Sequence, residues 1–599
     1  MVWVGVRSRF LSWIRRQRAG GSTHLPNAAG ATTDTWTVSA PAFDRTLATC
    51  VGIALAPVPG SSVPRRNSRA GGAGTMACLA AVGLLVSSSL HAQEQATPPS
   101  SPTGRPVTIA GNPILSDGRF YSTDPAPFVD GDTLWILAGR DEAPADVNDF
   151  IMNEWQLLAT ADPASRRWRH FPAVVRPEAV FAWAEPARAY AGQIVKARDG
   201  RFYLYAPVLQ RDSAAQDRFA IGVAVADRPT GPWRDAHPAG PIVSQRVPVA
   251  NDIQNIDPTV LVDDDGRVYL YWGTFGQLRA IELSSDMVTP IGEERTIGGL
   301  TGFFEAPWLM KRKGTYYLLY AANNAGPDSP CTPAVYHACQ AYGTAPSPLG
   351  PWTYRGVFLR PVSSTTSHSG AVEFKGQWYL AYHTADAVNG GHFRRSVAVD
   401  RLEWDDGATP PAIRPLTPTR APTNAAAPTR NIAPSAAAFA SNEPIPVQYW
   451  IKALNDGIVR ASPLPPDMWG NWTGENPPTA WIEYRWNQPV TVNGSRIWFF
   501  ADQPAGSGVG VAPPAQWRIE YYDRGWKPVP RASAFGTAPG RYEDVSFAPV
   551  TTRCLRAVFS ASAANGTNAG IAVQEWQVLT PDVAPAPPRL ADPSAAPCG

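Results

Sequence analysis

The sequence predicts an all-β protein in two parts, a five-bladed β-propeller followed by a β-sandwich of the jelly-roll type. The chain has 599 residues, which is longer than one hydrophobic core usually serves. It contains 22 Trp, 19 Tyr and 21 Phe together with 61 Pro and 50 Gly, as expected for many turns that join aromatic-rich strands. A glycine-led aromatic run also recurs five times, and this repeat indicates the number of blades.

Each run follows a turn signal such as Asp-Gly or Lys-Gly and alternates aromatic with aliphatic residues, as a sheet strand does. The runs begin at Gly131, Gly200, Gly266, Gly314 and Gly376. They lie roughly 50 to 70 residues apart, which is long for a propeller blade but leaves room for loop insertions. Five runs therefore predict five blades.

A polar residue precedes each run by roughly seven to nine positions, within a segment that reads as a strand. In chain order these residues are Asp124, Gln193, Asp257, Glu305 and His368. Because the first strand of each blade lines the central channel, their side chains should converge on the axis. Three are carboxylic acids, and like charges gathered in a channel are tolerated when their protonation states differ, as acid/base catalysis requires.

The segments around these acids, STDPAPF, NIDPTVLV and FFEAPWL, resemble those of glycoside hydrolase family 43, whose catalytic domain is a five-bladed β-propeller. The resemblance spans about residues 106–415. It implies that Asp124 is the general base, Asp257 tunes the pKa of the acid, and Glu305 is the general acid. The later run GGHFRRSVAVDRL resembles the family's closing segment, and it implies that Arg395 approaches the acid.

Other residues near these motifs are expected to bind substrate. Trp183 resembles an aromatic floor for the sugar, although inter-blade packing is the alternative, and Gln193 is expected to face the channel. Phe303 helps to form an apolar cage that raises the carboxyl pKa of Glu305. By the resemblance, His368 supports water or, in some members, a cation; a neutral hydrogen-bonding role is equally open.

The first 92 residues are predicted to be an extension and an export signal, and 93–105 a linker. Arg65, Arg66 and Arg69 precede an apolar core over 76–86 that is too short to span a membrane, and Ala92 suits cleavage. We therefore expect a secreted or periplasmic protein that starts at or shortly before Met76. The alternatives are a short buried helix and twin-arginine export.

Cleavage near Ala92 leaves four of the six cysteines. An even number in an exported protein favours disulfides, since such proteins fold in oxidising compartments. Cys331 and Cys339 flank a short loop that such a bond would close. Cys554 and Cys598 would tie the tail to the last domain.

Residues 416–438 are Pro/Ala/Thr-rich and predict a linker, and 581–599 are expected to form a tail. Between them, 439–580 carry short alternating strands that resemble the galactose-binding or discoidin-like jelly rolls of polysaccharide-acting enzymes. In those folds a loop and a late Glu often hold calcium. The matching residues here are Asn455, Asp456 and Glu575, and the absence of any metal is equally open.

The sequence thus predicts an inverting glycoside hydrolase that acts on pentose-containing plant cell-wall polysaccharide, as an α-L-arabinofuranosidase or β-xylosidase. It is expected to need no cofactor beyond a possible structural calcium. The formal charge of +2 gives no reason to expect a nucleic-acid partner, and none is expected at a membrane after signal cleavage. The alternatives are a propeller glycosidase with another specificity (arabinan, galactan or fructan) and a sugar-binding propeller without catalysis.

Overall fold

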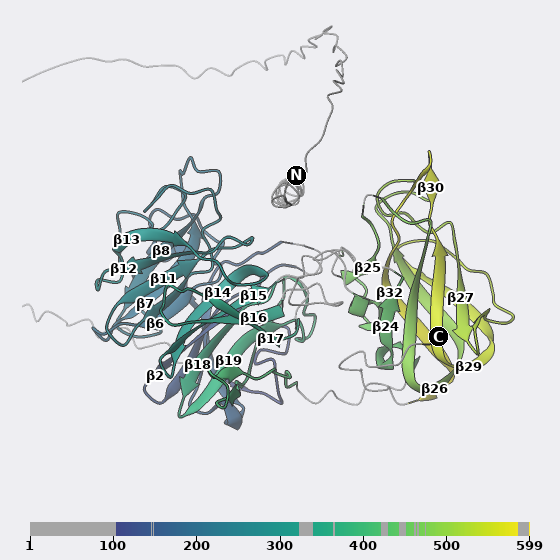
Figure 1. Cartoon of the computed structure of the whole chain (residues 1–599), viewed down its shortest axis with the longest axis horizontal. Helices are drawn as coiled ribbons and strands as arrows, with labels where there is room; N and C mark the ends of the chain where they lie inside the picture. Colours follow the sequence, from purple (N-terminus) through teal and green to yellow (C-terminus); the bar gives the residue numbers. More distant parts are fainter. Residues whose placement is uncertain are drawn as a thin grey trace, which may run out of the picture. The chain divides into compact units, whose positions relative to one another are not determined.

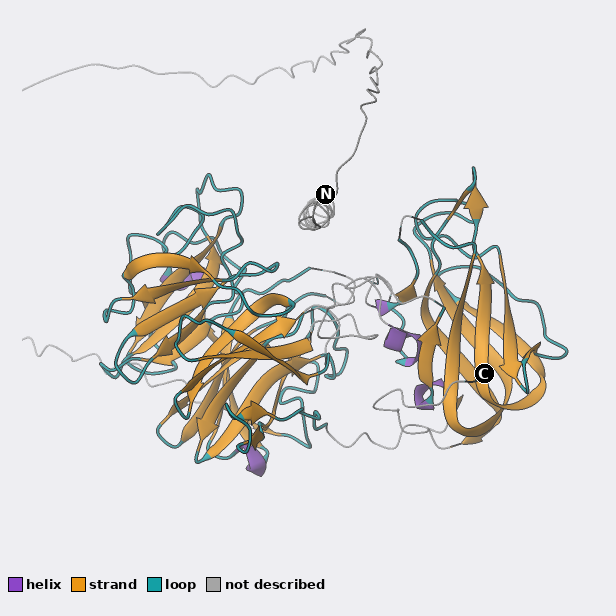
Figure 2. Cartoon of the chain, in the orientation of Figure 1, coloured by secondary structure: helices purple, strands orange, loops and turns teal. Residues whose placement is uncertain are grey.

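The computed structural model describes residues 104–144, 147, 149–322, 339–362, 366–420, 429–441, 451–460, 463, 467–473, 475–584 and 598. The expected export signal and Cys331 lie outside these residues. Within them the chain is almost entirely β-structure (Figures 1 and 2). The helical turns are α2 (Pro177–Val180), η1 (Pro163–Ser165), η2 (Ala433–Ser435) and η3 (Ile451–Asn455). None of the described helices is long and apolar enough to cross a membrane.

Five antiparallel sheets form the five predicted blades. Blade one contains β1 (Arg105–Thr108), β2 (Thr123–Asp130), β3 (Thr133–Gly139), β4 (Trp155–Thr160) and β5 (Arg167–Val175). Blade two contains β6 (Gln193–Lys196), β7 (Phe202–Leu209), β8 (Phe219–Ala226) and β9 (Arg234–Asp235). Blade three contains β10 (Thr259–Val262), β11 (Val268–Trp272), β12 (Arg279–Leu283) and β13 (Pro290–Thr296). Blade four contains β14 (Phe303–Arg312), β15 (Thr315–Ala322), β16 (Cys339–Ala345) and β17 (Thr353–Leu359), and blade five contains β18 (Ser369–Phe374), β19 (Gln377–Thr384) and β20 (Ser396–Arg401).

The five glycine-led runs form the second strand of each blade, namely β3, β7, β11, β15 and β19. The leading glycine of each run has a positive φ, between 55° and 91°, which the tight turn from the first strand requires and glycine adopts without strain. The first strands β2, β6, β10, β14 and β18 contact one another in this order, and β18 contacts β2. These contacts close the ring and place the five first strands around its axis.

The segment before blade one joins blade one to blade five. β1 pairs with β5 at the outer edge of blade one. Four residues later the chain reaches blade five, where the Asn112 amide donates to Val399 O and accepts from Val399 N, both at 3.0 Å, and Ile114 N donates to Val397 O at 2.8 Å. The same stretch thus stabilises both blades at the closure of the ring.

A further sheet follows the propeller, after a small pair of β21 (Trp404–Asp405) and β22 (Ala412–Ile413). Its strands are β23 (Thr429–Asn431), β24 (Ala437–Ala440), β25 (Trp469–Gly470), β26 (Thr479–Phe500), β27 (Gln516–Tyr522), β28 (Trp526–Pro528), β29 (Tyr542–Ser560) and β32 (Ala572–Ala584). The first half of β26 pairs with β24 and the second half with β32, with register shifts near the middle. Long strands that change partners at such irregularities run through both layers of a sandwich, and a second apolar core is enclosed here. A two-residue pair, β30 (Ala563–Ala564) and β31 (Thr567–Asn568), completes this part.

The predicted linker is shorter than 416–438. Thr419 Oγ1 donates to Asp400 Oδ1 at 2.6 Å in the propeller, and β23 pairs with β32 in the sandwich. The Pro- and Ala-rich composition did not predict these contacts at the two ends of the linker. Short strands and single hydrogen bonds leave no periodic pattern in a sequence.

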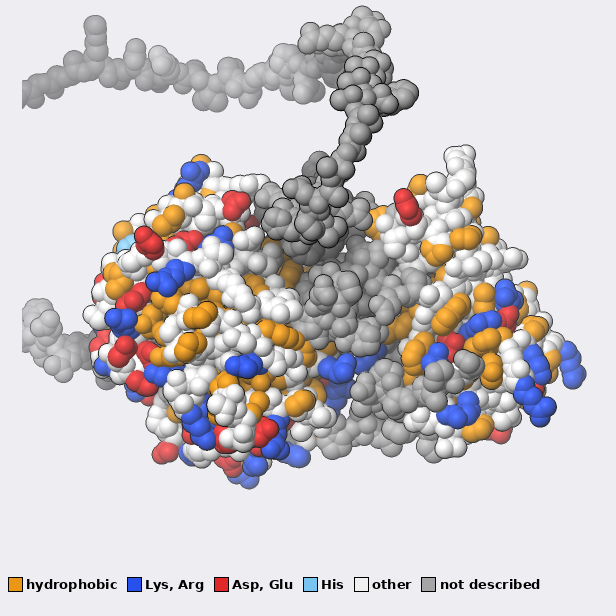
Figure 3. Space-filling model, in the orientation of Figure 1, with side chains coloured by type: hydrophobic (Ala, Val, Ile, Leu, Met, Phe, Trp, Pro, Cys, Tyr) orange, Lys and Arg blue, Asp and Glu red, His pale blue; other side chains and the backbone are white. Residues whose placement is uncertain are grey.

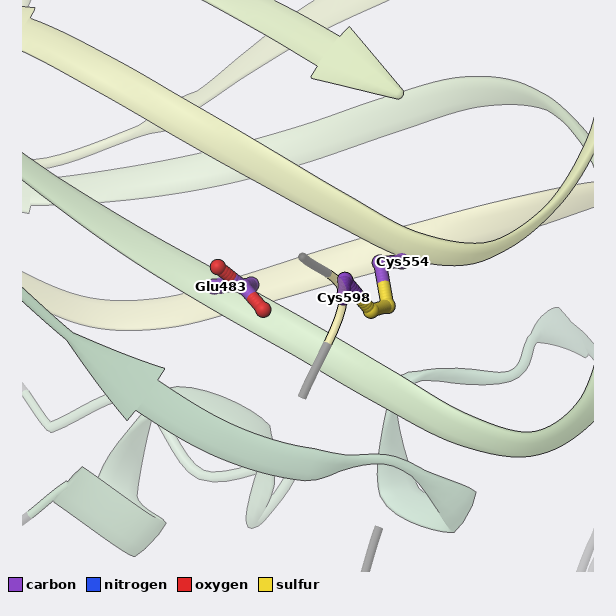
Figure 4. Close-up of side chains that lie close together, drawn as sticks. All are labelled: Glu483, Cys554 and Cys598. Carbon is purple, nitrogen blue, oxygen red and sulfur yellow. A yellow bond between two sulfur atoms is a disulfide. The ribbon is translucent and has the colours of Figure 1, made fainter. Parts of the chain in front are cut away.

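The predicted disulfide between Cys554 and Cys598 is present (Figure 4). It joins β29 to a residue 44 positions later and lies beside Glu483 of β26. On the face shown in Figure 3, acidic and basic side chains are interspersed over the propeller, in line with the small net charge.

Candidate active site

The five predicted polar residues lie at the beginning of the five inner strands. Asp124 is in β2, Gln193 opens β6 and Glu305 is in β14. Asp257 lies two residues before β10, and His368 directly precedes β18. All five residues are buried, with an exposed fraction of at most 9%. The inner strands surround one axis, so this end of the channel collects their side chains, as the sequence predicted.

Backbone irregularities re-aim the three acids. Asp124 and Asp257 have φ values of 51° and 55°, and Ala306, which follows Glu305, has a φ of 57°. Asp124, Asp257 and Ala306 each precede a proline. The β2–β3 and β14–β15 registers shift at the first and last of these positions. Non-glycine residues in this conformation are strained and cluster at functional sites, where bulges redirect side chains.

The three acids therefore do not occupy equivalent positions along their strands, although the sequence predicted that they would. Counted from the proline, Glu305 lies one residue earlier than Asp124 and Asp257. Its neighbour Ala306 takes the strained position and donates its N–H to Asp257 Oδ2 at 3.2 Å. This backbone contact joins blade four to blade three beside the two acids.

Asp124 is surrounded by donors and by two histidines. Its Oδ1 lies 3.2 Å from Arg395 Nη1, 3.0 Å from Thr123 Oγ1 and 3.3 Å from His383 Nδ1. Burial alone would raise the pKa of Asp124, but the Arg395 guanidinium holds it well below its ordinary value. Asp124 is therefore a carboxylate over the whole working range of pH.

Arg395 is held by a second carboxylate. Its Nε and Nη2 donate to the two oxygens of Asp141, each at 2.9 Å, and its backbone N–H donates to the same side chain at 2.8 Å. The guanidinium also lies over the Phe150 ring, 5.1 Å from its centre. Burial opposes the charge, but Asp124 and Asp141 raise the pKa of Arg395 above its ordinary value. This fork places one fixed positive charge against Asp124.

Glu305 has the opposite ionisation behaviour. Burial, with a smaller contribution from the charge of Asp124, raises its pKa to about 7, although the hydrogen bond from Thr274 Oγ1 at 2.8 Å favours the carboxylate. Burial and the neighbouring Glu305 raise the pKa of Asp257 well above its ordinary value too. One cluster thus holds an ionised carboxylate and an acid that retains its proton near neutral pH.

His368 lies at the edge of this cluster, with its Nδ1 3.9 Å from Asp124 Oδ1. Burial lowers its pKa to about 4, so the imidazole is neutral at neutral pH. A neutral imidazole suits both alternatives, a hydrogen-bonding role and support of a cation.

Three predicted substrate contacts also have partners within the protein. The Gln193 amide accepts from Val260 N at 2.5 Å and faces Val260 O, so it joins blade two to blade three. The Trp183 indole donates to Asp235 Oδ2 at 3.1 Å in the outermost strand of blade two and packs on Phe181. Phe303 packs on Tyr320 within blade four. These contacts connect neighbouring parts of the blades, and a role of the three residues in substrate binding stays a prediction.

Four further residues at the site had no sequence motif. Asp141, His383 and Thr274 contact Arg395, Asp124 and Glu305, and all three are buried. Phe275, next to Thr274, is 47% exposed, has a φ of 53° and meets the Phe304 ring edge to face at 5.6 Å. An exposed aromatic ring in a strained turn beside Glu305 is a surface on which a sugar can stack.

The predicted calcium ligands lie close together in the sandwich. Asn455 ends η3, Asp456 follows it, and Gly457 N donates to Glu575 Oε2 at 3.0 Å. The Asn455 amide nitrogen donates to Ala433 O and Ala436 O, and Asp456 Oδ1 accepts from Ile458 N. Oxygen donors of the type that calcium prefers are thus near one another, and several of them already have hydrogen-bond partners.

Residues 118–410 match the family model of glycosyl hydrolases family 43. A xylosidase/arabinosidase of Bacteroides ovatus is 30% identical over 332 residues, which cover 48% of this chain and 92% of that protein. Xylosidase/arabinosidase 43A of Humicola insolens is 30% identical over 347 residues, 49% of this chain and 96% of its own length. An arabinoxylan arabinofuranohydrolase of Bacillus subtilis is 35% identical over 311 residues, 45% of this chain and 57% of its own length. With its five blades and these matches, the chain belongs to glycoside hydrolase family 43 and is a glycosidase.

Proposed function

We propose that this enzyme hydrolyses pentosides of plant polysaccharide, as an α-L-arabinofuranosidase or β-xylosidase, in a single displacement that inverts the anomeric carbon. The observation that carries the mechanism is the opposed ionisation of two carboxyl groups in one buried cluster, Asp124 below its ordinary pKa and Glu305 at about 7. Pairs of acids whose surroundings separate their pKa values divide the roles of base and acid.

In this mechanism Asp124 removes a proton from a water molecule as the water oxygen bonds to the anomeric carbon. The bond from that carbon to the leaving oxygen breaks, and Glu305 gives its proton to this oxygen. Asp257 shares the buried site with Glu305, and repulsion between two carboxylates favours a proton within this pair. Arg395 fixes the orientation of Asp124 and prevents its protonation.

The printed names of the relatives support the substrate class, since they include xylosidase/arabinosidase and arabinoxylan arabinofuranohydrolase. A panel of 4-nitrophenyl glycosides tests it. We expect release of nitrophenol from the α-L-arabinofuranoside, the β-D-xyloside or both. Cleavage of a β-D-galactofuranoside or of fructan alone would assign another specificity, and no cleavage of any glycoside would favour a sugar-binding propeller.

The pH profile is expected to fall on its basic side. Glu305 must be protonated to act, and its pKa is raised to about 7, so kcat/KM should decrease as the pH rises through about 7. Asp124 must be ionised, and its lowered pKa keeps the acidic limb well below neutral pH. Replacing Glu305 with Gln should remove the basic limb; an unchanged limb in this variant would assign it to another group.

We further propose that the C-terminal sandwich is a discoidin- or galactose-binding-like accessory domain with calcium at Asn455, Asp456 and Glu575. The support is its layered strands and the closeness of these three residues. A rise in the Tm of the wild type with added calcium, absent in a Glu575→Gln variant, would support the site. An equal response in both proteins would contradict it.

Export to the periplasm or the exterior is also part of the proposal. It is supported by the apolar segment before Ala92 and by the disulfide Cys554–Cys598, because disulfides persist in oxidising compartments. N-terminal sequencing of the mature protein would test it: a start near Gln93 is expected, and an intact N-terminus would contradict it.

A further inference from the structure

The ring of His383 contacts both the backbone N–H and the carboxylate of Asp124. His383 lies on β19, the second strand of blade five. It is completely buried. Its Nε2 lies 2.8 Å from the carbonyl oxygen of Thr366, which only accepts, so Nε2 carries the hydrogen. Its Nδ1 then has a free lone pair, and this lone pair accepts the backbone N–H of Asp124 at 3.2 Å.

The N–H of Asp124 needs such an acceptor. The β2–β3 pairing is interrupted between Thr123 and Ala126, so this N–H does not enter the regular ladder. A buried N–H without an acceptor costs free energy comparable to a lost hydrogen bond. Asp124 also has a φ of 51°, a conformation that a non-glycine residue keeps only when its surroundings impose it.

We propose that His383 is a positioning residue that holds Asp124 in its strained backbone conformation and so aims the carboxylate at the attacking water. This inference rests on the proposed role of Asp124 as the base. The bond to Thr366 fixes the ring and leaves Nδ1 facing the Asp124 backbone. Arg395 holds the carboxylate itself, so the two contacts together determine where Oδ1 lies.

Three variants separate the functions of the two ring nitrogens. His383→Asn places an amide oxygen near the position of Nδ1 and keeps an acceptor for Asp124 N–H. His383→Gln reaches the position of Nε2, keeps a donor for Thr366 O and loses that acceptor. His383→Ala loses both. The matched control is His170→Asn in β5, because His170 is also buried in the propeller and bonded to another side chain, Gln156.

The measurements are kcat, KM, the pH profile and Tm, on the glycoside that the wild type cleaves fastest. We expect kcat to fall about 100-fold in His383→Gln and His383→Ala with KM little changed, as for a misplacement of about 1 Å in a catalytic group. The kcat of His383→Asn should stay within about tenfold of the wild-type value. His170→Asn should have a lower Tm and an unchanged kcat.

The acid limb of kcat/KM should move to higher pH in the Gln and Ala variants. The groups that face Asp124 are Arg395, His368, His383 and Thr123, with Asp257 and Glu305 also in the cluster. A carboxylate that moves out of place loses part of its contact with Arg395, the group that chiefly lowers its pKa. A structural role alone would lower Tm and leave this limb unchanged.

Equal kcat values for the Asn and Gln variants, or an Ala variant with the wild-type kcat and acid limb, would overturn the inference. A crystal structure of His383→Gln gives a second test, since φ of Asp124 should leave the positive region. A wild type that cleaves glycosides but no pentoside would contradict the proposed substrate class only, because the Asn and Gln variants can be compared on any substrate.

Discussion

Replacing Asp124 with alanine is expected to abolish hydrolysis of oligosaccharides and of activated aryl glycosides alike, with a loss in kcat of up to about 10⁴-fold. No other described carboxylate beside Arg395 is free to activate water, because Asp141 is fully bonded to that guanidinium. Steady-state kinetics on both substrate types measures the loss. Azide should restore cleavage of the aryl glycoside, since this anion attacks without needing a base.

Asp130→Ala is the matched control for this variant. Asp130 ends the same strand, β2, but forms a partly exposed ion pair with Lys196. Exposed pairs of this kind contribute little to stability, so its activity should equal that of the wild type. Substantial activity of Asp124→Ala without azide would contradict the assignment of Asp124 as the base.

Replacing Glu305 with alanine should discriminate between leaving groups. Hydrolysis of xylo- or arabino-oligosaccharides should fall by about 10³- to 10⁴-fold, because an alkoxide leaves poorly without a proton. A dinitrophenyl glycoside needs no proton, and its hydrolysis should fall by only about tenfold or less. The ratio of kcat/KM on the two substrates measures this difference.

Glu294→Ala is the matched control, because Glu294 also has a raised pKa but lies away from the proposed catalytic residues. Burial raises the pKa of Glu294 as well, but this residue lies on β13 at the outer edge of blade three and pairs with Arg279. Its activity on both substrates should be unchanged. Equal losses on both substrates in Glu305→Ala would show that Glu305 is not the acid.

Local patterns in the sequence were enough to predict the fold. Turn glycines and alternating aromatics identify the second strand of each blade, because a hairpin is specified by residues a few positions apart. Counting back from Gly131 or Gly314 then located Asp124 and Glu305 on the inner strands. The disulfide of Cys554 agrees with the expectation drawn from the even number of cysteines after the predicted cleavage site.

The detailed site depended on contacts between distant strands. The bulge before Pro307 shifts Glu305 by one position, and sequence counting had no signal for it beyond the proline itself. His383 and Asp141 lie 259 and 254 residues from the groups that they hold, so no local motif connects them. Gln193 lies at the predicted phase, and its amide also accepts a hydrogen bond from Val260 N of the adjacent blade.

Proton NMR of the first-formed product tests the central claim, single displacement by Asp124 and Glu305, most directly. With an aryl α-L-arabinofuranoside or β-D-xyloside, the sugar should appear first with the opposite anomeric configuration and only later equilibrate by mutarotation. This outcome requires a water molecule between Asp124 and the anomeric carbon, which corresponds to a carboxyl separation of about 6.5 to 9.5 Å. A first product that retains the configuration of the substrate would indicate a covalent glycosyl intermediate and contradict the mechanism.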